Sequence, residues 1–267
     1  QLEPPRYRLL ESTRLYAAQR LEESGEAAAA MQRHSEAMAC GAVELDALYW
    51  VTPDRELLRR FMADYDDLQM AYERACAASW TSAAADISGA LTVLRNLRVI
   101  GAGRHQRLKS AAQLLPAAQG ATRAKLLRLF ANTYVSTIQE VSRADAAREL
   151  VALRRELGDA QRLYEALGAQ AAVGVVVGDL QTATQAVAEG RQIERPDWPA
   201  RLRAQFNFHS GNVCKELGDI AGCARAMQEV LELTSRAGFD QGVWMAQLGL
   251  ADAALAVWIG GVTVLTV

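Results

Sequence analysis

Apolar residues recur every three or four positions through most of the chain, a spacing that predicts a succession of amphipathic helices. The clearest case follows Thr52 and Pro53, residue types that suit the start of a helix. Its apolar stripe consists of Leu58, Phe61, Tyr65, Leu68, Tyr72 and Ala75. No stretch before residue 253 alternates with the period of a strand. The pattern therefore predicts an all-α fold.

Further helices are expected on both sides of this stretch, joined by short connections that make neighbours in sequence antiparallel neighbours in space. The expected ranges are 9–23, 26–49, 82–99, 104–117, 121–139, 143–157, 160–176, 180–194, 200–217, 220–236 and 240–258.

The breaks between the later helices follow a regular grid. Gly158, Gly178, Gly218 and Gly238 are spaced in multiples of 20 residues, and the first three are each followed by Asp. The vacant grid position near 198 holds another helix breaker, the run 196–199 with a Pro at each end. Regular breakers between helix-forming blocks are typical of stacked helical repeats.

One segment, 204–238, resembles a tetratricopeptide repeat. Its small, turn and contact positions are occupied by Gly211, Gly218, Asp219, Cys223 and Met227, and the turn at Gly178 is followed by Ala183 and Val187 at the same offsets. The resemblance implies a right-handed superhelical array of antiparallel helix pairs, a tetratricopeptide-like solenoid, with a concave face for binding.

The N-terminal part is similar to a junction in bacterial regulators of the signal-transducing ATPase type. The likeness rests on 6–17, Gly25-Glu26, Arg33-His34 and the acidic run 64–68, and covers most of residues 6–75. There the junction closes a winged-helix-like module and leads into repeats that sense a ligand or partner. The phosphate-binding loop of such ATPases does not occur in this sequence. The resemblance therefore implies that ATPase and DNA-binding domains lie upstream in a longer parent protein.

These patterns divide the chain into four expected parts. Residues 1–24 form the end of a winged-helix-like module or a linker helix, and 25–140 form N-terminal helical repeats. Residues 141–258 form tetratricopeptide-like repeats, and 259–267 form an irregular apolar tail, native or a truncated repeat.

The charge distribution suggests one candidate binding surface. The formal net charge is −2, but residues 1–86, 87–139 and 140–267 carry −6, +8 and −4. A basic patch on stacked helices would attract an acidic partner or an anion. Its alternatives are a solvated face and docking against the acidic thirds, and direct nucleic-acid contact is not expected because aromatic residues are not interleaved. The candidate residues are Arg95, Arg98, Arg104, Arg107, Lys109, Arg123, Lys125 and Arg128.

A second candidate surface is the groove of the repeat at 204–238, represented by Asn207, Phe208 and Asn212. The function that these features favour is a non-catalytic sensor and protein-interaction region of a transcriptional regulator, which binds a small effector or a protein partner on its concave face. A free-standing tetratricopeptide adaptor for protein partners is the alternative, and self-association into a homo-oligomer remains open.

The sequence predicts no catalytic, cofactor-binding or metal-binding residues. A remote alternative, an all-helical metal-dependent enzyme, would use Asp64, Asp66 and Asp67, but the fourth-residue partner of such a motif is Met70. The three histidines form no ligand pair, and the four cysteines form no zinc or disulfide pattern. We therefore expect reduced thiols, a cytoplasmic location and no membrane association.

Overall fold

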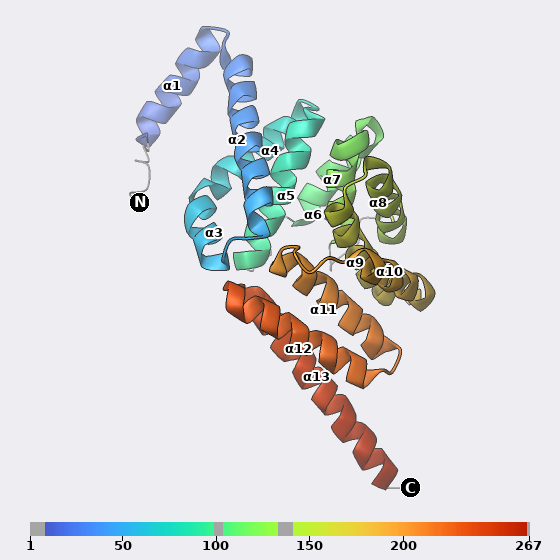
Figure 1. Cartoon of the computed structure of the whole chain (residues 1–267). Coiled ribbons are helices and arrows are strands. Elements are labelled where there is room, and N and C mark those ends of the chain that lie inside the picture. The colour runs from blue at the N-terminus through green and yellow to red at the C-terminus, as the bar shows by residue number, and fades with distance from the viewer. Residues whose placement is uncertain (1–8, 99–103, 133–140, 266–267) are drawn as a thin grey trace.

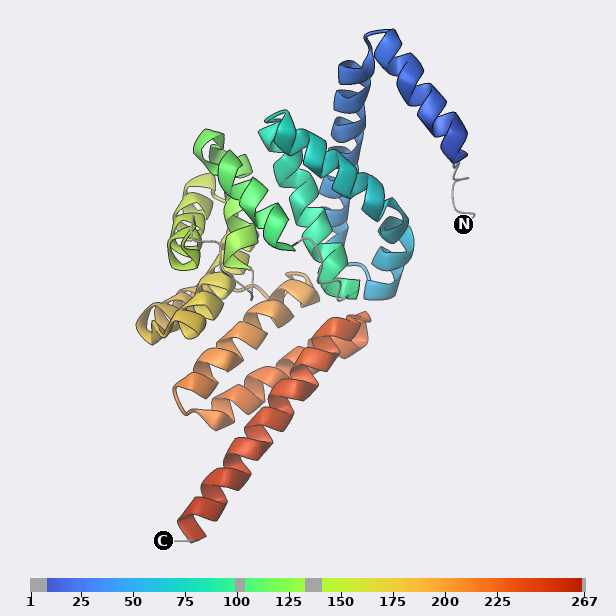
Figure 2. The ribbon, with the colours of Figure 1, turned by 180° about the vertical axis from the view of Figure 1, so that it is seen from behind.

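The computed structural model describes residues 9–98, 104–132 and 141–265, with side chains up to Ala256 except that of Arg104. Within these ranges all regular secondary structure is helical and no strand occurs, which confirms the all-α prediction. Figures 1 and 2 show the helices from opposite sides.

The N-terminal half contains α1 (Glu11–Glu23), α2 (Ala27–Tyr49), α3 (Asp54–Phe61), η1 (Met62–Asp64), α4 (Tyr65–Ala77) and α5 (Thr81–Arg98). Helices α2, α4 and α5 pack on one another, whereas α1 buries no residue and stands apart from the body of the protein (Figure 1).

The helix expected after Pro53 is interrupted. A 3-10 turn at η1 separates α3 from α4, so the apolar stripe lies on two helices rather than on one straight rod. Phe61, Leu68, Tyr72 and Ala75 of the predicted stripe are buried. Leu58 and Tyr65 are only partly buried, and Leu57 takes the buried position in α3 in place of Leu58. No side-chain cap bond from Thr52 forms, since Pro53 occupies the cap position of α3.

The remaining elements are α6 (Arg104–Leu114), η2 (Leu115–Ala117), α7 (Gly120–Ala131), α8 (Arg143–Leu157), α9 (Ala160–Val177), α10 (Leu180–Ile193), α11 (Ala200–Glu216), α12 (Ile220–Ala237) and α13 (Asp240–Leu265). From α7 onward the helices pack mainly on their neighbours in the chain. The main pairs are α7 with α8, α8 with α9, α9 with α10 and α11, α11 with α12, and α12 with α13.

The glycine grid has a direct structural cause. Gly158, Gly178, Gly218 and Gly238 all have φ between 70° and 80°, a left-handed conformation that ends a helix and suits glycine. The aspartate after each of the first three caps the next helix. Its carboxylate accepts a hydrogen bond from the backbone N–H three residues on, at 2.8–3.0 Å. Each Gly-Asp pair therefore ends one helix and starts the next.

Two helical glycines allow close packing between successive helices. A Cβ at Gly211 would lie 2.8 Å from Cε of Met227, and a Cβ at Gly174 would lie 2.9 Å from Cβ of Ala183. At Gly174 a side chain would force the helices apart, whereas at Gly211 the end of the Met227 side chain would have to shift. Gly211 thus has the packing role that its position in the sequence predicted.

The C-terminal segment differs from expectation. Residues 259–265 continue α13 as a helix and do not form an irregular tail. The stretch contains no proline, and Gly260, Gly261 and its β-branched residues disfavour a helix without excluding one. In Figure 1 the end of α13 projects beyond α12. Among the described residues, no helix is both long and apolar enough to span a lipid bilayer.

Candidate ligand-binding chamber

A cavity of about 1160 Å³ is lined by residues from both halves of the chain. Helices α2, α5, α6 and α7 contribute on one side, and α11, α12 and α13 on the other, with one residue each from α3 and α8 and two from α9. We call this cavity the chamber. Its volume is slightly above the range of roughly 300–1,000 Å³ that is usual for small-molecule sites.

A small set of contacts, which we call the latch, joins the start of α3 to the turn between α12 and α13. The carboxylate of Asp54 accepts hydrogen bonds from Nη2 of Arg201 at 2.6 Å and from the backbone N–H of Gln241 at 2.9 Å. Arg201 also donates to the carbonyl of Thr52, and the N–H of Asp54 donates to the carbonyl of Gly238 at 3.2 Å. The latch brings the first third of the chain against its last helices.

Aromatic rings hold the guanidinium of the latch in place. The Cζ of Arg201 lies 4.3 Å from the ring centre of Tyr49 and 4.0 Å from that of Phe239. Both distances are well within the range of a cation–π interaction. The side chains of Arg201 and Asp54 are each only 7% exposed, so this ion pair is largely removed from water.

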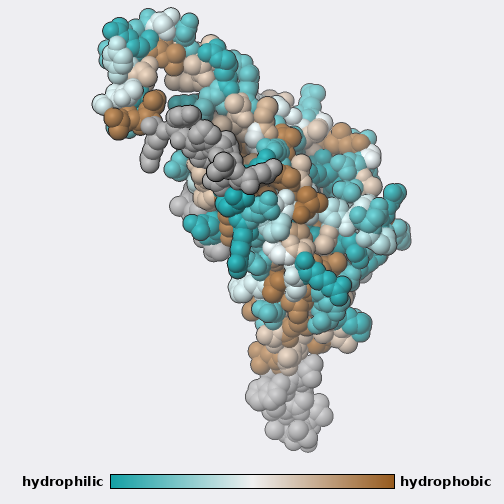
Figure 3. Space-filling view, turned by 60° about the vertical axis from the view of Figure 1, so that its left-hand side comes forward, coloured by the Kyte–Doolittle hydropathy of each residue, from teal (hydrophilic) through white to brown (hydrophobic). Residues whose placement is uncertain are grey.

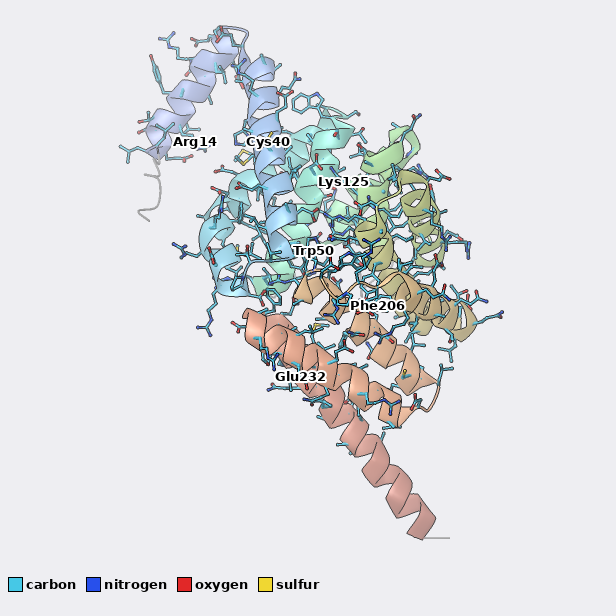
Figure 4. The ribbon with its side chains drawn as sticks, viewed as in Figure 1. Arg14, Cys40, Trp50, Lys125, Phe206 and Glu232 are labelled. Carbon is cyan, nitrogen blue, oxygen red and sulfur yellow. The ribbon has the colours of Figure 1, made fainter. Side chains whose placement is uncertain are left out.

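A second network joins α2, α7 and α9 at the chamber wall. Arg128 and Arg162 each pair with the same two carboxylates, those of Asp46 and Glu165, to form a closed square of alternating charge. Both guanidinium groups also lie within 6 Å of the ring centre of Trp50, which Figure 4 labels. Burial alone would raise the pKa of Asp46, but the charges of Arg128 and Arg162 outweigh it and lower this pKa to about 2.

Basic side chains exceed acidic ones in the chamber wall. Among the described lining residues six are basic and three are acidic. Lys125 pairs with Asp86, and its position on α7 is labelled in Figure 4. The basic residues are Arg95, Lys125, Arg128, Arg143, Arg162 and Arg201, and the acidic residues are Asp46, Asp54 and Asp86.

The opposite wall, formed by the C-terminal helices, combines apolar residues with the polar residues Arg201, Gln205, His209, Thr234 and Gln241. Its apolar lining residues are Ala204, Phe208, Val230, Phe239, Trp244 and Met245. Trp244 is 64% exposed, which is unusual for so large an apolar side chain. On the basic side, Gly89 of α5 lines the chamber, and a Cβ at this position would meet no atom within 4 Å. The helix face around Gly89 therefore borders open space.

One stripe of α11 presents buried polar groups to the chamber. Arg201, Gln205 and His209 follow one another at intervals of four residues and therefore share a face of the helix. Nε of Arg201, Oε1 of Gln205 and Nδ1 of His209 are buried and have no hydrogen-bond partner among the described residues. Burial lowers the pKa of His209 to about 4, so its ring is neutral at pH 7.

The eight basic residues that the sequence suggested as one binding surface lie in different surroundings. Arg95, Lys125 and Arg128 line the chamber. Arg123 lies outside it and pairs with Glu149 at the surface. Arg98, Arg107 and Lys109 do not line the chamber: Arg98 and Lys109 are exposed and Arg107 is buried. The side chain of Arg104 lies outside the described residues.

The three groove residues are also separated. Phe208 lines the chamber, whereas Asn212 is half-buried on α11 and does not. Asn207 is fully buried, and neither its amide oxygen nor its amide nitrogen has a partner within the described ranges. The structure gives no physical account of this unsatisfied amide.

Several chamber residues had no marker in the sequence. Asp46, Arg143 and Arg162 come from helices far apart in the chain, and only tertiary packing brings them together. The stripe on α11 did have a signal, because Arg201, Gln205 and His209 are polar residues spaced by four within a helix otherwise buried on several sides. The four-residue spacing of polar positions could have identified this face.

Asp64, Asp66 and Asp67 do not form a metal centre. Asp66 and Asp67 are exposed, and within the described part of the chain no three His, Cys, Asp or Glu side chains are grouped so that they could hold a metal ion. All four cysteines are unbridged. Comparison with known protein families and with curated proteins found no match.

Proposed function

We propose that this chain is a non-catalytic ligand-sensing region, and that the chamber is where its effector binds. The observation that carries this proposal is the cavity of about 1160 Å³ with walls from both halves of the chain. A ligand in this space would touch α5 and α7 as well as α11 and α13. Binding would thereby be coupled to the relative position of the two halves, which is what a sensor requires.

The sequence supports a more specific proposal. The repeat pattern of residues 204–238 and the junction-like segment 6–75 favour a tetratricopeptide-like array that follows the ATPase and DNA-binding domains of a transcriptional regulator. The left-handed glycines, the aspartate caps and the close approach at Gly211 are the local geometry that such repeats need. The parent reading frame tests this part, since it should encode a phosphate-binding loop upstream.

Ligand-induced stabilisation tests the chamber itself. A library of small organic molecules would be screened by thermal shift on the wild type and on Gly89→Trp. The new indole would fill the chamber from α5 without displacing an atom near Cβ. A ligand at a hundred times its Kd stabilises a protein by about 2.7 kcal/mol. We expect hits that raise the Tm of the wild type and have no effect on Gly89→Trp.

Gly41→Trp is the matched control. Gly41 is also a half-buried helical glycine whose Cβ would meet nothing within 4 Å, but it does not line the chamber. It should respond to ligands as the wild type does. Equal Tm shifts in all three proteins would locate binding elsewhere and refute the chamber as the effector site.

A second candidate function, contact with a protein partner, is favoured by α13. Trp244, Leu248 and Leu255 on this helix are exposed. Figure 3 shows hydrophobic residues on the narrow lower part of the molecule. Exposed apolar stripes of this kind mark interaction surfaces. If a second copy of the chain covers α13, sedimentation should show a dimer that Leu248→Ser dissociates. A monomer at all concentrations would exclude self-association.

A further inference from the structure

The chemistry of the chamber walls identifies a class of ligand. We propose that the effector is an amphipathic organic anion, with its charged group against the basic side chains of α5 and α7 and its apolar body against α11 and α13. This inference rests on the proposed function, because it assumes that the chamber is the binding site.

The chamber wall carries more positive than negative charge. Six basic and three acidic residues line the chamber within the described ranges, and Glu165 adds one more carboxylate through its contacts with Arg128 and Arg162. The sequence around the basic wall has the same bias, since residues 87–139 contain no Asp or Glu. A partly open site with net positive charge favours anions over neutral and cationic molecules.

The two walls differ in part. Arg95, Lys125 and Arg128 come from α5 and α7, where Ala85, Val93 and Leu129 also line the chamber. The large apolar residues Phe208, Trp244 and Met245 come from α11 and α13, where Arg201 is the one basic lining residue among the described residues. A small inorganic anion would leave these large apolar residues in contact with water. A molecule with both a charged group and an apolar body would cover both walls and bury the exposed face of Trp244.

The stripe on α11 adds polar specificity. Nδ1 of His209, a residue only 5% exposed in the chamber wall, lacks a hydrogen-bond partner among the described residues, as does Oε1 of Gln205. Buried polar atoms in proteins nearly always have a partner, so unsatisfied ones beside a cavity indicate a group that the ligand or an ordered water supplies. A polar atom of the ligand, or a water bound with it, therefore lies near α11.

A pair of fluorescent probes tests the inference. The anion 1-anilinonaphthalene-8-sulfonate and the neutral N-phenyl-1-naphthylamine share one ring skeleton and differ by the sulfonate. Each probe would be titrated into the full chain and into the variants Gly89→Trp and Gly41→Trp. Probe fluorescence that is lost in Gly89→Trp but kept in Gly41→Trp measures binding in the chamber. We expect the anion to bind there about tenfold more tightly than the neutral probe, a difference of about 1.4 kcal/mol, because the basic side chains attract the sulfonate.

Variants that change a single charge test whether the basic wall attracts the anion. Lys125→Gln should weaken binding of the anion by roughly three- to tenfold, and Asp86→Asn should strengthen it by a similar factor, as expected for one charge near a partly exposed site. Arg123→Gln, two residues from Lys125 but outside the chamber, is the control and should change nothing. The affinity of the neutral probe should be the same in all three variants as in the wild type.

The outcomes separate the two proposals. If Gly89→Trp blocks both probes but the neutral one binds as tightly as the anion, or if Lys125→Gln and Asp86→Asn have no effect, the anion inference is wrong and the chamber remains the site. If Gly89→Trp affects neither probe, the proposed function fails as well.

Discussion

Arg201 and Asp54 form a buried ion pair, with Nη2 and Oδ1 2.6 Å apart, between residues separated by 147 positions in the chain. The pair lines the chamber and links the start of α3 to α11. Buried ion pairs are costly to form but still costlier to break, because the remaining charge has no partner. The latch is therefore the contact whose loss should separate the two halves.

The first prediction concerns this pair. Asp54→Ala leaves the guanidinium of Arg201 buried without its carboxylate and should lower the free energy of unfolding by about 3–5 kcal/mol. Arg55→Gln is the neighbouring control, since Arg55 and Asp240 form an exposed ion pair whose loss should cost about 0–1 kcal/mol. Urea unfolding of both variants measures the difference. If both variants lose a similarly small amount of unfolding free energy, the latch contributes little to stability.

The second prediction concerns helix approach. Gly174→Ala would place a Cβ 2.8 Å from the carbonyl oxygen of Asp179 and 2.9 Å from Cβ of Ala183, so α9 and α10 must move apart. Overpacking of this kind should cost about 1–3 kcal/mol in urea unfolding. Gly41→Ala meets no atom within 4 Å and should instead stabilise the protein by up to about 1 kcal/mol, because alanine favours the helix. Stabilisation by both substitutions would contradict the close contact.

The third prediction is a pH dependence from His209. Its pKa is lowered from 6.5 to about 4 by burial, so the unfolded chain binds a proton in this pH range that the folded chain does not. Above pH 6.5 the ring is neutral in both states and His209 does not change the free energy of unfolding. As the pH falls from 6.5 to 4, His209 lowers this free energy by on the order of 3 kcal/mol. The stability difference between wild type and His209→Gln, measured by urea unfolding at several pH values, isolates this contribution. A difference that does not vary with pH would show that His209 titrates normally.

The fourth prediction concerns the square of charges. The pKa of Asp46 falls from 3.8 to about 2, which makes the ionised form stabilising above pH 3.8. That contribution, on the order of 2 kcal/mol, should disappear as the pH falls through 2. Asp46→Asn should accordingly be destabilised relative to wild type at pH 6, with a gap that narrows below pH 4. An equal gap at both pH values would argue against the coupling to Arg128 and Arg162.

Much of the fold was predictable because its signals are local. Gly158 and Asp159 act on the residues beside them, so their effect on the chain could be read from the sequence. The same holds for the buried stripe that contains Phe61 and Leu68. The bend at η1 and the helical end of α13 were not predictable, since each depends on the surface against which the segment packs or fails to pack.

The candidate site was predictable only in part. The basic block suggested Lys125 and Arg128, but it also included Arg123 and Lys109, which lie away from the chamber. Charge along a helix does not specify which face meets solvent and which meets another helix. Asp46 and Arg162 carried no sequence signal, because their pairing joins helices 116 positions apart.

The sequence by itself determined the helices, where most of them end and which neighbours pack tightly, because helix periodicity, glycine conformation and aspartate capping act within a few residues. Only the tertiary structure decided that the start of α3 meets the turn before α13 and that a chamber lies between the two halves. Those contacts join segments far apart in the chain, and their partners are chosen by packing and burial of charge, which no local pattern encodes.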